Sequence, residues 1–314
     1  MRTESTSMTA RLIAIDWGTS SFRAALADGE GTVLERCEKP QGILAAEGRF
    51  ADVLREAIAP WRQLHPDLPI LMCGMIGSRQ GWHEVPYVHC PATLASISAA
   101  VTMFEEPGIG AIGIVPGVDV RTAGNAPDVM RGEETQILGA IAQLGLDTAI
   151  CVHPGTHAKW VRVENRTIAG FETFMTGEVY AALRGHTILG RMMSDGAFSE
   201  AGFRRGLEAS AENGAGPGAL LHRIFSTRTQ GLFGELDASE SADYLSGLLI
   251  GSEMREGLRR GAQDLVILGA HDLEARYRMA ADHLGVRRRI APPDCAVAGL
   301  LAIARTAGLI GNTP

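Results

Sequence analysis

Residues suited to chemistry first appear near the N-terminus of the chain. An apolar strand ends at Asp16, the run Gly18-Thr19-Ser20-Ser21 is typical of a tight turn, and Phe22–Ala27 is expected to return as a second strand. Gly18 permits the close approach of a bulky anion, and the amides and hydroxyls that follow it can donate to phosphate oxygens. Asp16 can hold Mg²⁺ through water, and Arg23 adds a fixed positive charge. An ordinary hairpin turn can contain the same small polar residues, so both interpretations stay open on this segment alone.

The same arrangement occurs a second time in the chain. The apolar strand Thr148–Val152 runs into the turn His153-Pro154-Gly155-Thr156-His157, and Val161–Val163 leads the chain back. A third strand is expected from Thr167 to Phe174. Two such hairpins, one in each domain and facing each other across a cleft, would grip the phosphate tail of a nucleotide from both sides.

A polar loop follows the buried strand Ile70–Gly74. It contains Arg79, Gln80 and Trp82 among glycines. Ligands bind at the ends of strands in open α/β sheets, and an arginine fork beside an amide and an aromatic ring suits a polar ligand with a carboxylate. The alternative is a surface loop with an exposed arginine and a half-buried tryptophan.

Two acidic residues, Glu133 and Glu134, begin a helix that is expected to end in the Gly145 region. Acids in a first helical turn are most often partners of the helix dipole, but Gly132 just before them allows the backbone close to a ligand. Farther along the chain, a buried strand from Leu265 ends in Gly269 and Ala270, where a flat ring could approach the backbone closely.

Hydrophobic spacing and turn residues predict the remaining elements. Phe50–Leu64 carries apolar residues at helical intervals, and residues 31–37 are expected to complete an antiparallel meander of three strands. Thr176 is expected to cap a further helix. Other helices are expected over residues 92–103, 199–209, 218–225, 239–260, 272–284 and 294–307, and strands over 110–116 and 288–291.

Composition argues against several classes of protein. The 314 residues suffice for two domains with separate cores, and 46% hydrophobic with 21% charged residues is ordinary for a globular chain. A net charge of −7 without a basic block argues against non-specific nucleic-acid binding. No transmembrane-length stretch or signal-peptide pattern is present, so we expect a cytoplasmic protein that does not use a membrane. Five single cysteines fit reduced thiols, and the spacing of His83, Glu84, His89 and Cys90 matches no usual zinc signature.

Five segments of the chain together resemble the 2-dehydro-3-deoxygalactonokinase family. They are Ile15–Arg23, Cys73–Trp82, Met130–Gln136, Pro154–Trp160 and Phe174–Glu178, and the likeness covers nearly the whole chain from about residue 11. The resemblance implies an α/β protein with two ribonuclease-H-like domains, the actin/hexokinase-like ATPase fold, and a cleft between them. We therefore expect an N-terminal extension over residues 1–10, a first domain over 11–130 and a second over 131–314.

The resemblance also implies a reaction and assigns residues to it. With ATP and Mg²⁺, the γ-phosphoryl group would pass to the 6-hydroxyl of 2-dehydro-3-deoxy-D-galactonate, a step of galactonate breakdown. The phosphate motifs fall on Asp16–Ser21 and Gly155–Lys159, and the adenosine side on Gly269 and Ala270. In related sugar kinases an acid at the start of the helix between the domains is the catalytic base, which falls on Glu133 or Glu134.

One departure and one alternative affect these assignments. The wider superfamily often has an acid where this chain has His153-Pro154, so metal placement depends on Asp16 alone. Lys159 or Arg23 would supply positive charge to the phosphates, but Lys159 could also be a strand-edge lysine in solvent.

Two other functions stay open. The same fold could phosphorylate a neutral hexose, although such a sugar needs no guanidinium like that of Arg79. The cleft could instead serve an ATPase switch, but no helix-turn-helix, basic arm or peptide-binding domain is visible to give a switch its output. The residues do not choose between galacto and gluco epimers, and they leave the oligomeric state, including a homodimer, undetermined.

Overall fold

The computed structural model describes residues 9–121, 126–211, 219–259, 264–269 and 271–311. The chain packs into two compact units. The first runs to Ala149 and adds Arg162–Phe171 and the chain from Ala291, and the second comprises Ile150–Val161 and Glu172–Ile290. The adenosine candidate Ala270 and most of the expected extension 1–10 lie outside the described residues.

A six-stranded mixed sheet forms the centre of the first unit. Its strand order is β3-β2-β1-β4-β7-β6, with β1 (Ala10–Trp17), β2 (Phe22–Asp28), β3 (Val33–Lys39), β4 (Ile70–Cys73), β6 (Thr102–Glu106) and β7 (Gly110–Ile114). The first three strands form the predicted antiparallel meander, in which Asp16 pairs with Arg23. β4 runs parallel to β1 with Cys73 beside Asp16, so both strands end at the same edge of the sheet.

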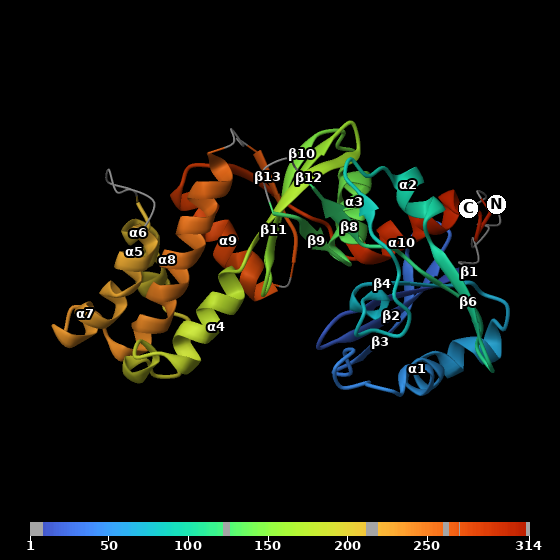
Figure 1. The fold of residues 1–314 in the computed structure, drawn as a ribbon, viewed down its shortest axis with the longest axis horizontal. Coiled ribbons are helices and arrows are strands. Elements are labelled where there is room, and N and C mark those ends of the chain that lie inside the picture. Colours follow the sequence, from blue (N-terminus) through green and yellow to red (C-terminus); the bar gives the residue numbers. More distant parts are fainter. Residues whose placement is uncertain (1–8, 122–125, 212–218, 260–263, 270, 312–314) are drawn as a thin grey trace, which may run out of the picture. The chain divides into compact units, whose positions relative to one another are not determined.

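Helix α1 (Phe50–Leu64) packs against this sheet (Figure 1) and has the predicted bounds. The apolar positions that predict the helix are also its buried positions, namely Val53, Leu54, Ala57, Ile58 and Trp61. Trp61 Nε1 donates to Glu35 Oε2 at 2.7 Å, which ties α1 to β3. The helix stops before Pro66, because helical backbone is disfavoured in the residue that precedes a proline.

The helix expected over residues 92–103 is shorter than predicted. Helix α2 (Leu94–Ala99) ends at Ala99, whereas Thr102 and Met103 belong to β6. Pairing with β7, from Thr102 opposite Ile114 onward, overrides the helical spacing there.

A small three-stranded sheet of the first unit is not predicted from the sequence. Its strand order is β5-β8-β9, with β5 (Val88–His89), β8 (Val118–Val120) and β9 (Asp128–Met130). These strands are too short to show a hydrophobic period.

Two helices of the first unit approach each other through glycine. A Cβ on Gly139 of α3 (Glu133–Leu144) would lie 2.0 Å from the carbonyl oxygen of Cys295, the first residue of α10 (Cys295–Thr306). Helix α3 ends at Gly145, whose φ of 63° suits glycine. The compact units group α3 and α10 with the first sheet, whereas the sequence assigns both to the second ribonuclease-H-like domain. The domain boundary at 130/131 stays a prediction.

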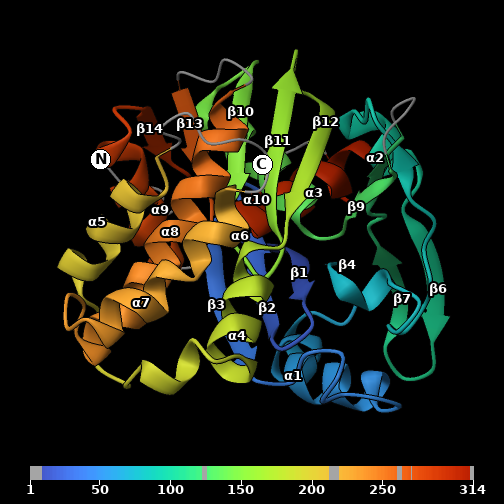
Figure 2. The ribbon, with the colours of Figure 1, turned by 60° about the vertical axis from the view of Figure 1, so that its left-hand side comes forward.

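Most strands of a second sheet belong to the second unit. Its order is β12-β11-β10-β13-β14, with β10 (Ala149–His153), β11 (Ala158–Glu164), β12 (Thr167–Phe174), β13 (Asp264–Ile267) and β14 (Arg287–Ile290). The strands of the second hairpin are thus present as predicted, and β13 runs parallel to β10. Helices α8 (Ala238–Leu258) and α9 (His271–His283) share a core with this sheet (Figure 2) around Val152, Trp160, Met254 and Tyr277.

The rest of the second unit is helical, as expected. It contains α4 (Thr176–His186), α5 (Glu200–Ala209), α6 (Ala219–Ile224) and α7 (Ser226–Leu232), and short 3₁₀ turns occur at η1 (Met75–Gly77) in the first unit and η2 (Gly190–Met192) in the second. The predicted Thr176 cap is wrong, because Met175 is the N-cap of α4 and Thr176 is already helical. Among the described residues, no helix combines the length and apolarity needed to cross a bilayer.

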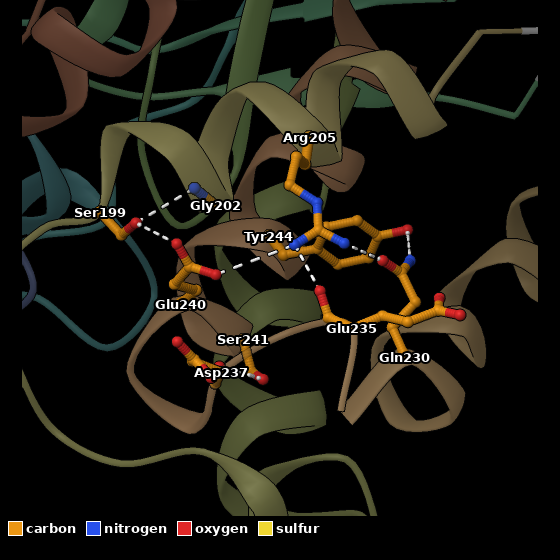
Figure 3. Close-up of polar contacts among 9 residues, drawn as sticks. All are labelled: Ser199, Gly202, Arg205, Gln230, Glu235, Asp237, Glu240, Ser241 and Tyr244. Atoms are coloured by element: carbon orange, nitrogen blue, oxygen red, sulfur yellow. Dashed lines mark hydrogen bonds and ion pairs between the residues drawn. The ribbon is translucent and has the colours of Figure 1, made fainter. Parts of the chain in front are cut away.

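Glycines also let α5 cross α8 closely. A Cβ on Gly206 would lie 2.1 Å from the carbonyl oxygen of Tyr244, and one on Gly247 would lie 2.0 Å from that of Phe203. Figure 3 shows the polar contacts beside this crossing: Arg205 donates to the Glu235 carbonyl and to Gln230 Oε1, both at 2.7 Å. These hydrogen bonds tie α5 to α7 and to the loop that precedes α8.

We expect Gly206→Ala to destabilise the chain, because the new methyl group meets backbone that cannot move cheaply. Overpacking of this kind costs about 1–3 kcal/mol. Gly185→Ala in α4 is the matched control, since its Cβ would meet no atom within 4 Å. Helix propensity alone should make that control more stable by about 0.5–1 kcal/mol. Urea unfolding of both variants measures the two changes, and a Gly206→Ala variant at least as stable as the parent would contradict the close crossing.

Candidate functional site

The first candidate site lies in the first unit, where the ends of β1 and β4 meet the start of α3. Gly74 follows β4 with φ 93°, and a Cβ there would lie 3.2 Å from Asp16 Oδ1 and 2.7 Å from the Trp17 carbonyl oxygen. Gly132 precedes α3 with φ 106°, and its Cβ would lie 3.1 Å from Gly74 Cα. Both positions require glycine, because the backbone is left-handed and there is no room for a side chain. The contact brings Asp16 to the first turn of α3.

Asp16 has two polar neighbours at this point. Gln136 Nε2 donates to Asp16 Oδ2 at 3.3 Å, and Arg23 Nη1 lies 3.7 Å from the same oxygen. Burial raises the pKa of Asp16 to about 6; the charge of Arg23 opposes this shift and that of Glu133 adds to it. Sequence reasoning assigned no role to Gln136. The available signal is its position three residues after Glu133, about one helical turn along α3.

The two carboxylates at the start of α3 differ in exposure. Glu133 is half-buried and accepts a hydrogen bond from the Arg131 backbone N–H at 3.0 Å. Glu134 is fully buried, with one oxygen accepting from the Gly132 N–H at 2.6 Å and the other from the Thr135 hydroxyl at 2.8 Å. Burial, with the charge of Glu133, raises the pKa of Glu134 to about 7 although its hydrogen bonds oppose the shift. Of these two carboxylates, Glu133 is the one that combines proximity to Asp16 with an accessible side chain.

The first phosphate hairpin closes through its own backbone. The Gly18 N–H donates to the Ser21 carbonyl at 2.9 Å, which leaves Thr19 and Ser20 exposed. A Cβ on Gly18 would come no closer than 3.7 Å to any other group, so packing within the chain does not demand glycine there. A surface hollow of about 320 Å³ borders the hairpin and is lined by Ser20, Ser21, Phe22, Arg23, Glu38, Lys39 and Pro40.

The loop after β4 does not gather its three candidates at one point. The Arg79 side chain is 84% exposed, with Glu84 Oε1 3.5 Å from its Nε, and Gln80 is also exposed. Trp82 packs against the core instead, with ring centroids 6.2 Å from Phe50 and 5.2 Å from Phe104. The carboxylate-binding role of Arg79, Gln80 and Trp82 stays a prediction.

The second phosphate turn, in the second unit, is supported by α4. A Cβ on Gly177 would lie 2.5 Å from the Gly155 carbonyl oxygen, and the Glu178 N–H donates to the Thr156 carbonyl at 3.0 Å. The Glu178 carboxylate also holds His157, whose Nε2 lies 2.5 Å from Oε2. As at Gly18, a Cβ on Gly155 would meet only ordinary contacts, the nearest at 3.9 Å.

Lys159 does not point into solvent. The residue is only 5% exposed, and its Nζ donates to Thr173 Oγ1 at 2.8 Å. The alternative of a solvent-exposed strand-edge lysine is therefore wrong. Its proposed contact with phosphate stays a prediction.

The adenosine candidate Gly269 lies beside the second phosphate turn. The Leu268 N–H donates to the Val152 carbonyl at 2.9 Å, which continues the pairing of β13 with β10. Gly269 has φ 131°, and a Cβ there would lie 3.6 Å from Pro154. The turn and Gly269 thus occupy neighbouring positions at the carboxyl ends of parallel strands, where α/β sheets bind ligands.

The carboxylate of Asp16 fits a magnesium ion that is held mainly by water molecules and phosphate oxygens. Among the described residues, no group of three or more His, Cys, Asp or Glu side chains could hold a metal ion. Mg²⁺ keeps several waters and binds through one or two carboxylates together with substrate phosphates. A single carboxylate that is 16% exposed and lies beside the predicted phosphate hairpin meets that requirement.

Comparison with known proteins identifies the family. A family model described as 2-keto-3-deoxy-galactonokinase matches residues 16–303. The chain belongs to the 2-keto-3-deoxy-galactonokinase family. It is 39% identical over 296 residues to a probable 2-dehydro-3-deoxygalactonokinase of Rhizobium meliloti strain 1021, covering 93% of this chain and 96% of the relative. It is 36% identical over 282 residues to the 2-dehydro-3-deoxygalactonokinase of Escherichia coli K12, covering 88% and 91%.

Solved structures agree with this family and with its fold. The crystal structure of a candidate 2-dehydro-3-deoxygalactonokinase from Sinorhizobium meliloti matches with a TM-score of 0.84 and 38% identity, covering 94% of this chain and 98% of that one. Component A of (R)-2-hydroxyglutaryl-CoA dehydratase from Acidaminococcus fermentans matches with a TM-score of 0.51 at 14% identity, covering 96% and 100%, which shows the fold alone. The predicted actin/hexokinase-like ATPase fold is confirmed.

We expect Glu134 to lower the free energy of unfolding of this chain as the pH rises. Its pKa is about 7 in the folded chain against an ordinary 4.5, so between these values the folded state binds a proton that the unfolded state has released. The penalty is absent below the lower value and complete above the upper one, where it reaches about 3 kcal/mol. The free energy of unfolding should therefore decrease more between about pH 5 and about pH 8 for the parent than for Glu134→Gln. Urea unfolding at the two pH values measures this decrease. An equal pH dependence in the two proteins would contradict this assignment.

Proposed function

We propose that this chain transfers the γ-phosphoryl group of ATP to the 6-hydroxyl of 2-dehydro-3-deoxy-D-galactonate, giving 2-dehydro-3-deoxy-6-phosphogalactonate. The observation that carries the proposal is membership of the 2-keto-3-deoxy-galactonokinase family over residues 16–303. Two observations of the fold support it. Asp16 and Glu133 lie near one edge of the first sheet, and each unit contains one of the two turns that are predicted to bind phosphate. Phosphoryl transfer asks a protein mainly to align groups and neutralise charge, with little covalent chemistry.

The two turns are proposed to hold the phosphates of ATP. Gly18 and Gly155 each have space for a Cβ within the chain, so internal packing leaves the choice of glycine unexplained at both positions. Close approach of a phosphate would explain it. Thr19 and Ser20 are exposed residues, and their hydroxyls and amides would donate to phosphate oxygens. The Gly155–His157 turn would do the same from the second unit.

Asp16 is proposed to hold Mg²⁺ through water, close to the first hairpin. With a pKa near 6, the side chain is mostly ionised at neutral pH, and Gln136 fixes one of its oxygens. When bound, the ion would neutralise charge on the β- and γ-phosphates. Arg23 and Lys159 are the proposed cationic groups of the protein.

Glu133 is the better candidate for the base that accepts the proton of the attacking hydroxyl. Its side chain is accessible, and Asp16 and Glu133 are near enough for the charge of one to raise the pKa of the other. Glu134 is fully buried, and both of its oxygens already accept hydrogen bonds from the loop and helix. Glu134 is therefore better suited to shaping the start of α3.

The remaining assignments complete the proposal. Arg79, with Gln80 and Trp82, is proposed to bind the substrate carboxylate, and this favours a sugar acid over a neutral hexose. Gly269 is proposed to contact the adenosine. A cytoplasmic location and a homodimer stay predictions.

The decisive experiment measures ADP release from Mg-ATP with a panel of acceptors. The panel contains 2-dehydro-3-deoxygalactonate, its gluconate epimer, galactonate, glucose and no acceptor. We expect strong turnover with the first compound, because the family relatives are named for it. Stronger turnover with glucose would indicate a neutral hexose kinase. Equal slow release with every acceptor and with none would indicate an ATPase switch and refute the kinase.

We expect Glu133→Gln to lower kcat by about 10²- to 10⁴-fold, the usual contribution of a general base. The amide keeps the size of the side chain but cannot accept the proton. Steady-state kinetics with saturating ATP and acceptor measure the loss, and Glu134→Gln is the matched comparison because it makes the same change one residue away. If Glu133→Gln keeps full turnover while Glu134→Gln loses it, the role of base moves to Glu134.

A further inference from the structure

Arg131 is a buried cation next to the proposed base, and the proposed reaction assigns it no role. The residue is only 7% exposed. Its Nη2 donates to the Val85 carbonyl at 2.6 Å, and its Cζ lies 4.4 Å from the centre of the Tyr87 ring. Its Nε and Nη1 are buried without a hydrogen-bond partner among the described residues. Two nitrogens of a buried guanidinium, which together carry three N–H bonds, thus lack an acceptor among the described residues.

Such an arrangement is poorly suited to stability alone. A buried charge loses its hydration, and an apolar side chain of similar volume often serves a core as well or better. One carbonyl and one ring face return only part of that free energy. The presence of arginine at this position therefore calls for a role in which its particular contacts matter.

The contacts of Arg131 join two parts of the first unit. Its backbone N–H donates to Glu133 Oε2 at 3.0 Å, while its guanidinium contacts the loop that runs from Gly77 to Tyr87. A Cβ on Gly77 would lie 2.9 Å from Arg131 Nη1 and equally close to Ile114 Cγ2. Gly77 is thus the residue that makes room for the guanidinium. The same loop carries Arg79, the proposed carboxylate contact.

We infer that Arg131 is a positioning residue that fixes the Gly77–Tyr87 loop relative to Glu133. An acceptor whose carboxylate is held by this loop then presents its hydroxyl to the base at a set distance. This inference rests on the proposed kinase function. The contacts given above for Arg131 lie at Glu133 and on the Gly77–Tyr87 loop rather than on the predicted phosphate hairpin, so its loss affects use of the acceptor and spares the binding of ATP.

The test is the kinetics of Arg131→Met, with acceptor and ATP varied separately. The side chain keeps similar volume but loses the hydrogen bond to Val85 and the charge over Tyr87. We expect kcat/KM for the acceptor to fall by about tenfold or more, since small misplacements of reacting groups have large effects on rate. The KM for ATP should stay within about twofold of the parent, a separation that general structural damage would not produce. Arg55→Met, which removes an exposed guanidinium from α1, is the matched control.

Two further variants keep the test valid if Arg131→Met does not fold. Gly77→Ala places a methyl group against Arg131 Nη1, and Tyr87→Leu removes the aromatic ring, while both variants keep the arginine. Each variant should lower kcat/KM for the acceptor, as Arg131→Met does. Acceptor kinetics within twofold of the parent in the folded variants would overturn the inference, and so would KM values that rise together for ATP and acceptor. A parent without acceptor-dependent turnover would instead refute the proposed function.

Discussion

The backbone contact between Gly132 and Gly74 is the constraint on which the candidate site of the first unit depends. Each residue has a positive φ, and a Cβ on either one would meet the backbone of the other segment or of β1. The first turn of α3 can therefore reach the ends of β1 and β4. The proximity of Glu133 to Asp16 follows from that approach, and so does the hydrogen bond from Gln136 to Asp16.

The close approach of α3 to the ends of β1 and β4 also places several carboxylates near one another. Asp16, Glu133 and Glu134 lie near one edge of the sheet, and burial raises the pKa of both Asp16 and Glu134. The start of α3 offsets part of this cost, because backbone N–H groups and the helix dipole favour carboxylates there. Perturbed carboxylates of this kind gather where a protein binds cations or moves protons, which agrees with the proposed roles.

Local patterns predicted much of the secondary structure. The helical spacing of Phe50–Leu64 gave the bounds of α1, and the two strand-turn-strand segments are hairpins as expected. The failures have physical causes. Residues 102–103 join a strand because β7 offers them a partner. The solvent-exposed alternative for Lys159 is wrong, because the residue is buried and its Nζ donates to Thr173 on the neighbouring strand. A propensity pattern contains neither partner.

The sequence by itself determined the family, the hairpins, the start of α3 and the residue types available for phosphate and proton chemistry. Those features depend on short stretches of chain, where spacing and turn residues act locally. Only the tertiary structure decided which acid is accessible, that Gln136 meets Asp16 across 120 residues, and that Arg131 lies buried between a loop and the proposed base. These contacts follow from strand order and from glycine-to-backbone packing, and both join segments that no local pattern connects.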